Sequence, residues 1–230
     1  MTSREVILRE MGLTPIWVDR ARVVNAPASA PAAQPSPAER EAAVANLSWQ
    51  ELIASIATCT ACKLCETRTN TVPGVGDRSP SWMVIGEAPG ENEDKQGEPF
   101  VGKAGQLLDA MLIAVGKKRG DGVYIANIIK CRPPGNREPE PDEIAACAPY
   151  LRRQIVLAQP KLLLASGKFA AQTLLNCDDT VGAMRALPAS ESQRDGVPII
   201  VTYHPSSLLL SPLEKAKAWD DLLKAKALVA

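Results

Sequence analysis

The sequence contains very little histidine and no excess of either charge. One of its 230 residues is a histidine, and 26 basic side chains balance 26 acidic ones. Zero net charge excludes a polycation that holds nucleic acid by bulk attraction, so any nucleic-acid function must rest on local patches. No apolar run approaches the roughly 20 residues that a membrane-spanning helix needs. The N-terminus mixes acids and bases among its apolar positions, which predicts that it is not a signal peptide.

Six cysteines are present, and several of them are clustered. Without a secretory signal we expect a reducing, cytoplasmic environment, where clustered cysteines bind metal more often than they form disulfides. Cys59 and Cys62 form a tight pair, whereas Cys131 and Cys147 lie far downstream. A zinc ribbon needs a second such pair, so the pattern favours an iron–sulfur cluster. Spacing alone does not choose the four ligands, because Cys65 continues the first pair at the same interval.

Proline divides the chain into parts. The stretch 25–37 is rich in alanine and proline and has no side chains large enough to build a core, which predicts an extended linker. It separates an N-terminal segment, 1–24, from a domain over 38–230. We expect the segment to dock on that domain, with a protein partner as the alternative. A second proline-rich stretch, 133–141, predicts a rigid loop inside the domain.

The domain alternates apolar segments with amphipathic ones. Near-continuous apolar runs predict strands at 81–86, 123–130, 161–167 and 197–203. Helical signals cover 36–58, 103–117, 141–159, the stretch after 167 to about 176, and 214–229. This alternation predicts a three-layer α/β/α sandwich with a central parallel four-stranded sheet. Ligands of such sheets bind just beyond the carboxyl ends of the strands.

Chemically active residue types follow three of these strands. Gly86 opens a glycine-rich loop whose spacing matches neither a dinucleotide motif nor a P-loop. Asn127 is an amide within an apolar strand, where it is either a satisfied structural group or a reader of a nucleobase edge. His204 follows the last strand and precedes a proline, and this position favours a catalytic or binding role.

Two further features lie in loops. Phe100 is one of only two phenylalanines and stands between Pro99 and Val101. An aromatic ring there is either a core plug or a stacking platform for a planar ligand. The leucines at 208–210 are either core residues or a wedge that enters a base stack.

These motifs, in this order, resemble the family 4 uracil-DNA glycosylases, the iron–sulfur type. The matching text is CTACKLCETRT at 59–69, GEAPGENEDKQGEPFVGKAGQLLDAML at 86–112, VYIANIIKCRPPGNREPEPDEIAAC at 123–147 and HPSSLLL at 204–210. The resemblance implies a [4Fe-4S] cluster on Cys59, Cys62, Cys131 and Cys147, with Cys65 and Cys177 spare. It implies a uracil site made of Gly86, Glu87, Ala88, Phe100, Asn127 and His204. Ser207 and Leu210 depart from the family's usual aromatic residue and arginine, which affects a phosphate contact and the shape of the wedge.

The resemblance also implies an activity. The expected protein is a monomeric DNA-repair enzyme that hydrolyses the bond between uracil and its sugar in DNA, with His204 and Glu87 as catalytic residues. Glu93 and Asp94 are further candidates for positioning the attacking water. Two alternatives are a non-catalytic nucleic-acid-binding module and a zinc-stabilised nucleotide-binding protein. Basic clusters at 117–119, 130–137 and 152–153 predict that DNA is held weakly and locally.

Overall fold

The structure is a computed structural model that describes residues 7–8, 10–12 and 36–229. Contacts separate residues 1–35 from a compact unit, Ser36–Ala230, and the fold and site concern this unit. The docking predicted for segment 1–24 and the linker predicted before Ser36 lie outside the described residues. Within the described residues, no helix is both long and apolar enough to cross a membrane.

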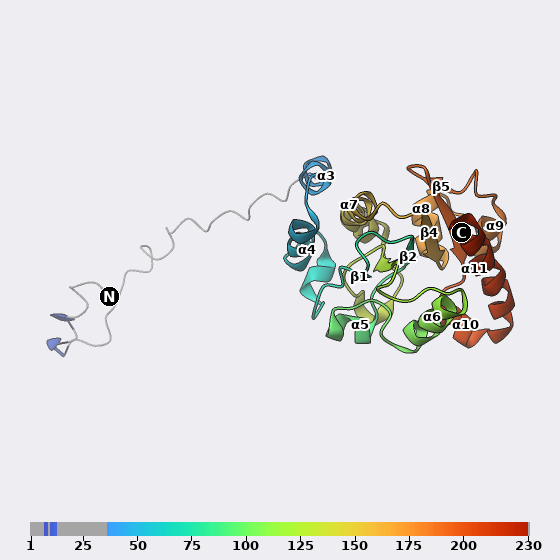
Figure 1. Cartoon of the computed structure of the whole chain (residues 1–230). Helices are drawn as coiled ribbons and strands as arrows, with labels where there is room; N and C mark the ends of the chain where they lie inside the picture. The colour runs from blue at the N-terminus through green and yellow to red at the C-terminus, as the bar shows by residue number, and fades with distance from the viewer. Residues whose placement is uncertain (1–6, 9, 13–35, 230) are drawn as a thin grey trace. The chain divides into compact units, whose positions relative to one another are not determined.

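A six-stranded sheet forms the centre of the unit, in the order β1-β3-β2-β4-β6-β5 (Figure 1). Its parallel strands are β2 (Trp82–Gly86), β3 (Val123–Asn127), β4 (Leu162–Ser166) and β6 (Val197–Thr202). These four strands lie where the sequence predicts them. The sequence did not predict the two edge strands, β1 (Val75–Gly76) and β5 (Gln193–Arg194), which pair antiparallel. Each has two residues, too few to show a period in the sequence.

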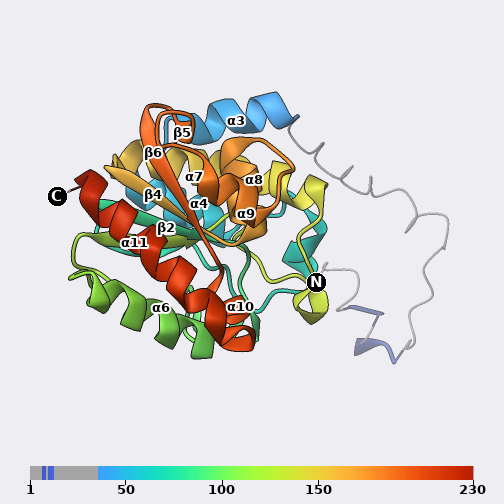
Figure 2. The same ribbon diagram turned by 90° about the vertical axis from the view of Figure 1, so that its right-hand side faces the viewer.

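Alternate side chains of the parallel strands enter two separate apolar cores. Met83 and Ile85 of β2 face one core, while Trp82 and Val84 face the other. The first core is covered by α4 (Trp49–Ala57), α7 (Pro141–Ala158), α8 (Lys168–Leu175) and α9 (Val181–Ala186). The second is covered by α6 (Lys103–Ala114) and α11 (Lys215–Val229), which lie together on one side of the sheet in Figure 2. Burial of both sheet faces confirms the predicted three-layer α/β/α sandwich.

The first predicted helix, 36–58, is two helices. Ser36 and Glu39 form a capping box at the start of α3 (Pro37–Ala45), with the Ser36 N–H donating to Glu39 Oε2 at 2.8 Å. The helix ends at Asn46, and a second capping box begins α4, where the Ser48 N–H donates to Glu51 Oε2 at 2.8 Å. The apolar spacing continues through this break, but the second capping box starts a new helix.

Three short helices of six residues each were not predicted. They are α5 (Glu91–Gln96), α9 and α10 (Pro205–Leu210). The predicted strand 123–130 is also shorter, since β3 ends at Asn127 and residues 128–130 leave the sheet. This early end brings the Asn127 side chain to the carboxyl edge of the sheet.

The strand order creates a crevice at the end of β2. This strand lies between β3 and β4, so the chain leaves β2 to one side and later returns to the other. Loops diverge at such a reversal, and ligands bind there. The residues that follow all four parallel strands therefore converge on one place.

Candidate active site

A cavity of about 490 Å³ lies at the carboxyl ends of the four parallel strands. Five of the sequence-predicted site residues line it, namely Glu87, Ala88, Phe100, Asn127 and His204. The sixth, Gly86, packs directly against two of them. The structure therefore brings all six predicted residues together.

Gly86 allows the close approach of two of these side chains. A Cβ atom at this position would lie 2.5 Å from Oδ1 of Asn127 and 2.6 Å from Cζ of Phe100. Both contacts are shorter than real Cβ atoms make, so only glycine fits. The amide and the ring thus meet over the last residue of β2.

Asn127 is 2% exposed, and its Oδ1 has no hydrogen-bond partner among the described residues. Leaving a buried polar atom unpaired costs on the order of 1–3 kcal/mol. An acceptor kept in this condition at the edge of a cavity is suited to a ligand that donates a hydrogen bond.

Phe100 is buried and held in an unusual backbone conformation, with φ of 54°. The Arg119 guanidinium fixes this turn by donating to the carbonyls of Pro99 and Phe100, each at 2.8 Å. Gly105 of α6 packs so closely that a Cβ atom would lie 1.7 Å from the Phe100 carbonyl oxygen. The ring centroid lies 5.4 Å from that of His204, with 32° between the planes. Phe100 is therefore a rigid wall of the cavity.

The hydrogen bonds of His204 fix its tautomer. Its Nδ1 accepts from the Ser206 backbone N–H at 3.2 Å and lies 2.7 Å from the Ser206 hydroxyl. An Nδ1 that accepts leaves the proton of the neutral ring on Nε2. Burial lowers the pKa of His204 to about 4, against the opposing charge of Glu93. At neutral pH the ring is uncharged and offers Nε2–H as a donor.

The acidic residues near the loop have different roles. Glu93 Oε1 accepts from the Val101 N–H at 2.9 Å, and its Oε2 accepts from the Gly90 N–H at 3.1 Å. Asp94 is 2% exposed and accepts from the Thr69 N–H at 2.9 Å. These carboxylates clamp loops together, so neither is free to position a water molecule.

Of the three carboxylates that the sequence offers for positioning water, Glu87 remains available in the cavity. Burial and the neighbouring charge of Glu138 raise the pKa of Glu87 to about 7, against the opposing charge of Lys168. Glu138 and Lys168 also line the cavity. A carboxyl group with a pKa near neutrality is suited to exchange protons during a reaction.

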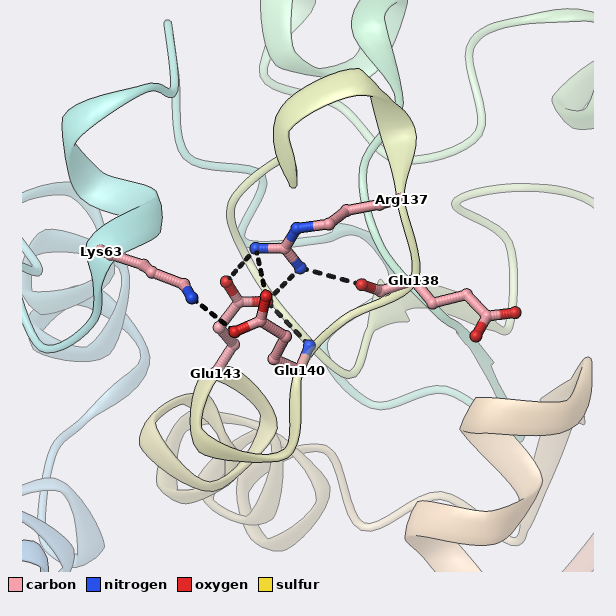
Figure 3. Close-up of polar contacts among 5 residues, drawn as sticks. All are labelled: Lys63, Arg137, Glu138, Glu140 and Glu143. Atoms are coloured by element: carbon pink, nitrogen blue, oxygen red, sulfur yellow. Dashed lines mark hydrogen bonds and ion pairs between the residues drawn. The ribbon is translucent and has the colours of Figure 1, made fainter.

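An ion-pair network fixes the rim of the cavity (Figure 3). Arg137, which lines the cavity, donates to both oxygens of the fully buried Glu143, at 2.9 and 2.5 Å. The same carboxylate accepts from the Glu140 N–H at 2.9 Å, and Lys63 pairs with the Glu140 side chain. Lys63 follows Cys62 in the chain. The network therefore ties the rim to the start of α7 and to the cysteine loop.

Four cysteines line one small pocket at the first of the two cores. They are Cys59, Cys62, Cys131 and Cys147, the set that the family resemblance implies. Cys65 and Cys177 are not among the lining residues of this pocket, and no cysteine of the described chain is in a disulfide. Over residues 36–229, no group of three or more His, Cys, Asp or Glu side chains has the arrangement to hold a metal ion.

Positive groups surround this pocket. Arg40 donates to Cys59 Sγ at 3.3 Å, and Arg68 donates to Cys131 Sγ at 3.1 Å. The side chain of Lys130 is fully buried and lines the pocket. Burial raises the pKa of the Cys147 thiol to about 12, against the opposing charge of Lys130. Burial thus keeps the unbound Cys147 thiol protonated, whereas the three cations would stabilise a negatively charged group bound in the pocket.

Several cations of the predicted basic patches are bonded to other groups of the protein. Besides Arg119, the Lys117 ammonium donates to Ser81 Oγ at 2.8 Å. Arg152 pairs with Glu41, and Arg153 donates to the Leu47 carbonyl at 2.6 Å. Clusters 117–119 and 152–153 are therefore partly structural.

The sequence did not identify Lys168, Arg137, Glu138 or Tyr203 as cavity residues. Lys168 directly follows Gly167 at the end of β4, so the rule that ligands bind beyond strand ends was sufficient to find it. Arg137 and Glu138 belong to the predicted proline-rich loop, and nothing in their spacing indicates that this loop turns toward the sheet.

Residues 73–223 match the sequence model of the uracil DNA glycosylase superfamily. The chain belongs to this superfamily. It is 41% identical to the type-4 uracil-DNA glycosylase of Archaeoglobus fulgidus over 183 residues, which are 77% of this chain and 91% of the relative. It is 40% identical to that of Thermotoga maritima, over 74% of this chain and 89% of the relative. A type-5 uracil-DNA glycosylase of Pyrobaculum aerophilum is 32% identical over 60% of this chain and 66% of the relative.

Within the superfamily, these identities confirm the resemblance to family 4. The superfamily match begins at residue 73, after Cys59 and Cys62, and includes Cys131 and Cys147. It also contains every residue of the cavity at the strand ends.

Proposed function

We propose that this protein hydrolyses the N-glycosidic bond of uracil in DNA and leaves an abasic site. Membership of the uracil DNA glycosylase superfamily supports the reaction. The observation that carries the substrate is the buried, unpartnered Oδ1 of Asn127 beside the ring of Phe100. The cavity contains an acceptor and a flat apolar wall in the arrangement that a pyrimidine needs.

Recognition follows from the donors and acceptors of the base. Uracil donates from N3–H to Asn127 Oδ1 and accepts at O4 from the amide nitrogen. Cytosine presents the reverse pattern and leaves buried groups unpaired, which costs on the order of 1–3 kcal/mol for each group. A base inside a duplex must first leave the stack, at a cost of a few kcal/mol. Phe100 replaces part of the lost stacking.

Departure of uracil creates negative charge on the base. His204 is neutral, and its Nε2–H stabilises that charge at O2 as it develops. Glu87 in its ionised form accepts a proton from the water that attacks the sugar. The loop after β2 therefore supplies the general base, Glu87, and the loop after β6 supplies His204, which stabilises the departing uracil.

Cys59, Cys62, Cys131 and Cys147 would hold a [4Fe-4S] cluster. Four cysteines around one pocket supply the thiolate donors that such clusters use, and nearby cations offset the negative charge. When bound, the cluster supplies a cross-link among the cysteine loop, the segment after β3, and α7.

The test is excision by protein purified anaerobically. We expect a coloured preparation that converts a uracil-containing oligonucleotide into one that alkali cleaves at the uracil position. H204A should be slower by about 100- to 1000-fold in single-turnover assays, the usual effect of removing one donor to a developing anion. K226A, an exposed change on α11, is the control and should excise at the wild-type rate.

Three outcomes would contradict the proposal. Uracil-DNA binding without alkali-labile sites would indicate a non-catalytic module, and a colourless preparation that contains zinc would contradict the cluster. Wild-type excision by H204A would remove the assigned role of the histidine.

A further inference from the structure

A lysine behind the cavity is completely enclosed by protein. The Lys130 side chain is 1% exposed, and its ammonium donates to the Asn127 backbone carbonyl at 2.7 Å. It also donates to Gln154 Oε1 at 2.7 Å. The mechanism above gives this group no role, although it contacts the main chain of the residue that reads uracil.

Gln154 is the second hydrogen-bond acceptor of the Lys130 ammonium. It is fully buried, and its amide nitrogen donates to the Pro73 carbonyl at 2.6 Å and lies 3.2 Å from the Tyr124 hydroxyl. A side chain with both ends bonded has one orientation. The Lys130 ammonium is thus fixed, and it fixes the Asn127 carbonyl in turn.

Lys130 also borders the cysteine pocket. It lines that pocket with all four candidate ligands and precedes Cys131 in the chain. Its two oxygen partners are neutral, and a charged group in a dry interior requires opposite charge nearby. A cluster bound by the four cysteines of the adjacent pocket, as proposed above, would supply that charge.

The hydrogen bond from the Lys130 ammonium to the Asn127 carbonyl lies at the end of β3. After Asn127 the chain leaves the sheet, and the next N–H, that of Ile128, donates to the Gly86 carbonyl at 2.9 Å. The Asn127 carbonyl and the Ile128 N–H belong to one peptide group, so the two hydrogen bonds together fix the main chain that carries the Asn127 side chain. Recognition groups must be held within about 0.5 Å of their working position.

We propose that Lys130 is a positioning residue for uracil recognition, joining the main chain of Asn127 to the cysteine pocket. This inference rests on the proposed function. It gives the cysteine site a part in base selectivity, because Lys130 contacts the Asn127 carbonyl and also lines the cysteine pocket.

The test compares K130M, which removes the ammonium but keeps most of the volume, with Q154L, which removes one of its two acceptors. K226M is the matched control, since Lys226 is exposed on α11 and lines neither the cavity nor the cysteine pocket. The probes are oligonucleotides with 2′-fluorinated deoxyuridine or deoxycytidine, which resist cleavage. The readouts are the ratio of the two dissociation constants, the iron content and the visible absorbance.

We expect K130M to retain iron and to lose about tenfold or more of the wild-type preference for uracil, equivalent to about 1.4 kcal/mol. Q154L should lose part of that preference, and K226M should stay within about twofold of wild type, as surface substitutions usually do. If K130M does not accumulate as folded protein, Q154L decides the question, because an unchanged ratio there overturns the proposal.

Two other results would overturn it. One is an unchanged ratio in K130M. The other is a K130M protein that loses its preference for uracil only when it also loses iron, while Q154L keeps both the preference and the iron. That result would limit the role of Lys130 to the cysteine site. A wild-type protein with no preference for uracil contradicts the proposed function instead, so the two failures are distinct.

Discussion

His204 and Glu87 face the same cavity, and burial favours the uncharged form of both. It lowers the pKa of His204 to about 4 and raises that of Glu87 to about 7. Between pH 5.5 and 8 the histidine therefore stays neutral while the carboxyl group changes its charge. The pH dependence of the reaction below pH 7 should therefore report Glu87 and not His204.

Excision should accordingly rise with pH and level off above about 7. A base acts in its ionised form, so each pH unit below the pKa of Glu87 lowers the active fraction about tenfold. E87Q should be slower by about 100-fold at pH 8 and should lose this dependence. Single-turnover rates of both proteins from pH 5.5 to 8.5 measure the effect. The same inflection in E87Q would assign the titration to another group.

Single residues also show where sequence reasoning stops. Asn127 and His204 were identifiable because each is a polar residue in or directly after an apolar strand. Glu87, Glu93 and Asp94 were equivalent candidates in the sequence. Only contacts with distant segments, at Val101 and Thr69, show that two of the three are structural clamps.

At the scale of elements, α6 is pressed against the turn that carries Phe100. G105A should push the two apart, because its Cβ atom would overlap the Phe100 carbonyl oxygen. Overpacking of this kind costs about 1–3 kcal/mol. We expect G105A to lower the free energy of unfolding by that amount and to weaken binding of the fluorinated uracil probe.

G182A in α9 is the matched control. A Cβ atom there meets nothing closer than 4.0 Å, and the glycine has ordinary helical geometry. Replacing such a helical glycine by alanine should stabilise the protein by about 0.5–1 kcal/mol. Urea denaturation measures both variants, and wild-type stability in G105A would show that α6 moves aside freely.

Glu143 joins the cavity rim to α7, and its loss should weaken both. Arg137 lowers the pKa of Glu143 below its usual 4.5, so the stabilisation is fully present above pH 4.5 and declines as the carboxylate is protonated at lower pH. E143Q should lower the free energy of unfolding by about 2 kcal/mol at pH 7, since Arg137 is partly exposed and its pairing partly screened.

The difference between E143Q and wild type should shrink in acid. The control is E214Q. Glu214 pairs with Lys217, and its side chain is more exposed than that of Glu143, so E214Q should stay within about 0.5 kcal/mol of wild type. Urea unfolding at pH 7 and pH 4 tests both statements. An equal loss in the two variants would mean that burial of Glu143 adds nothing.

The long elements were predictable and the short ones were not. Four apolar strands and the helices that separate them show their periods in the sequence. The helices α5, α9 and α10 have six residues each, and β1 and β5 have two, which is below the length at which a period is visible. The break before Ser48 was readable in principle, because Ser48 and Glu51 repeat the capping signal of Ser36 and Glu39.

At the scale of the whole molecule, the candidate cysteine ligands come from three separate segments. C147S should abolish the visible absorbance and lower the melting temperature, because it removes the ligand that α7 contributes. C177S should keep both, since Cys177 does not line the pocket. Absorbance and thermal unfolding under anaerobic conditions measure this. A colourless C177S or a fully coloured C147S would reassign the ligands.

The two edge strands have a consequence for behaviour at high concentration. A long exposed edge offers a row of unpaired peptide groups to which another chain can add a strand. Here the parallel strands are bordered by β1 and β5, which run antiparallel and are only two residues long. Each side of the sheet therefore presents a very short template for strand addition. At high concentration the protein should therefore have little tendency to aggregate through the edges of its sheet.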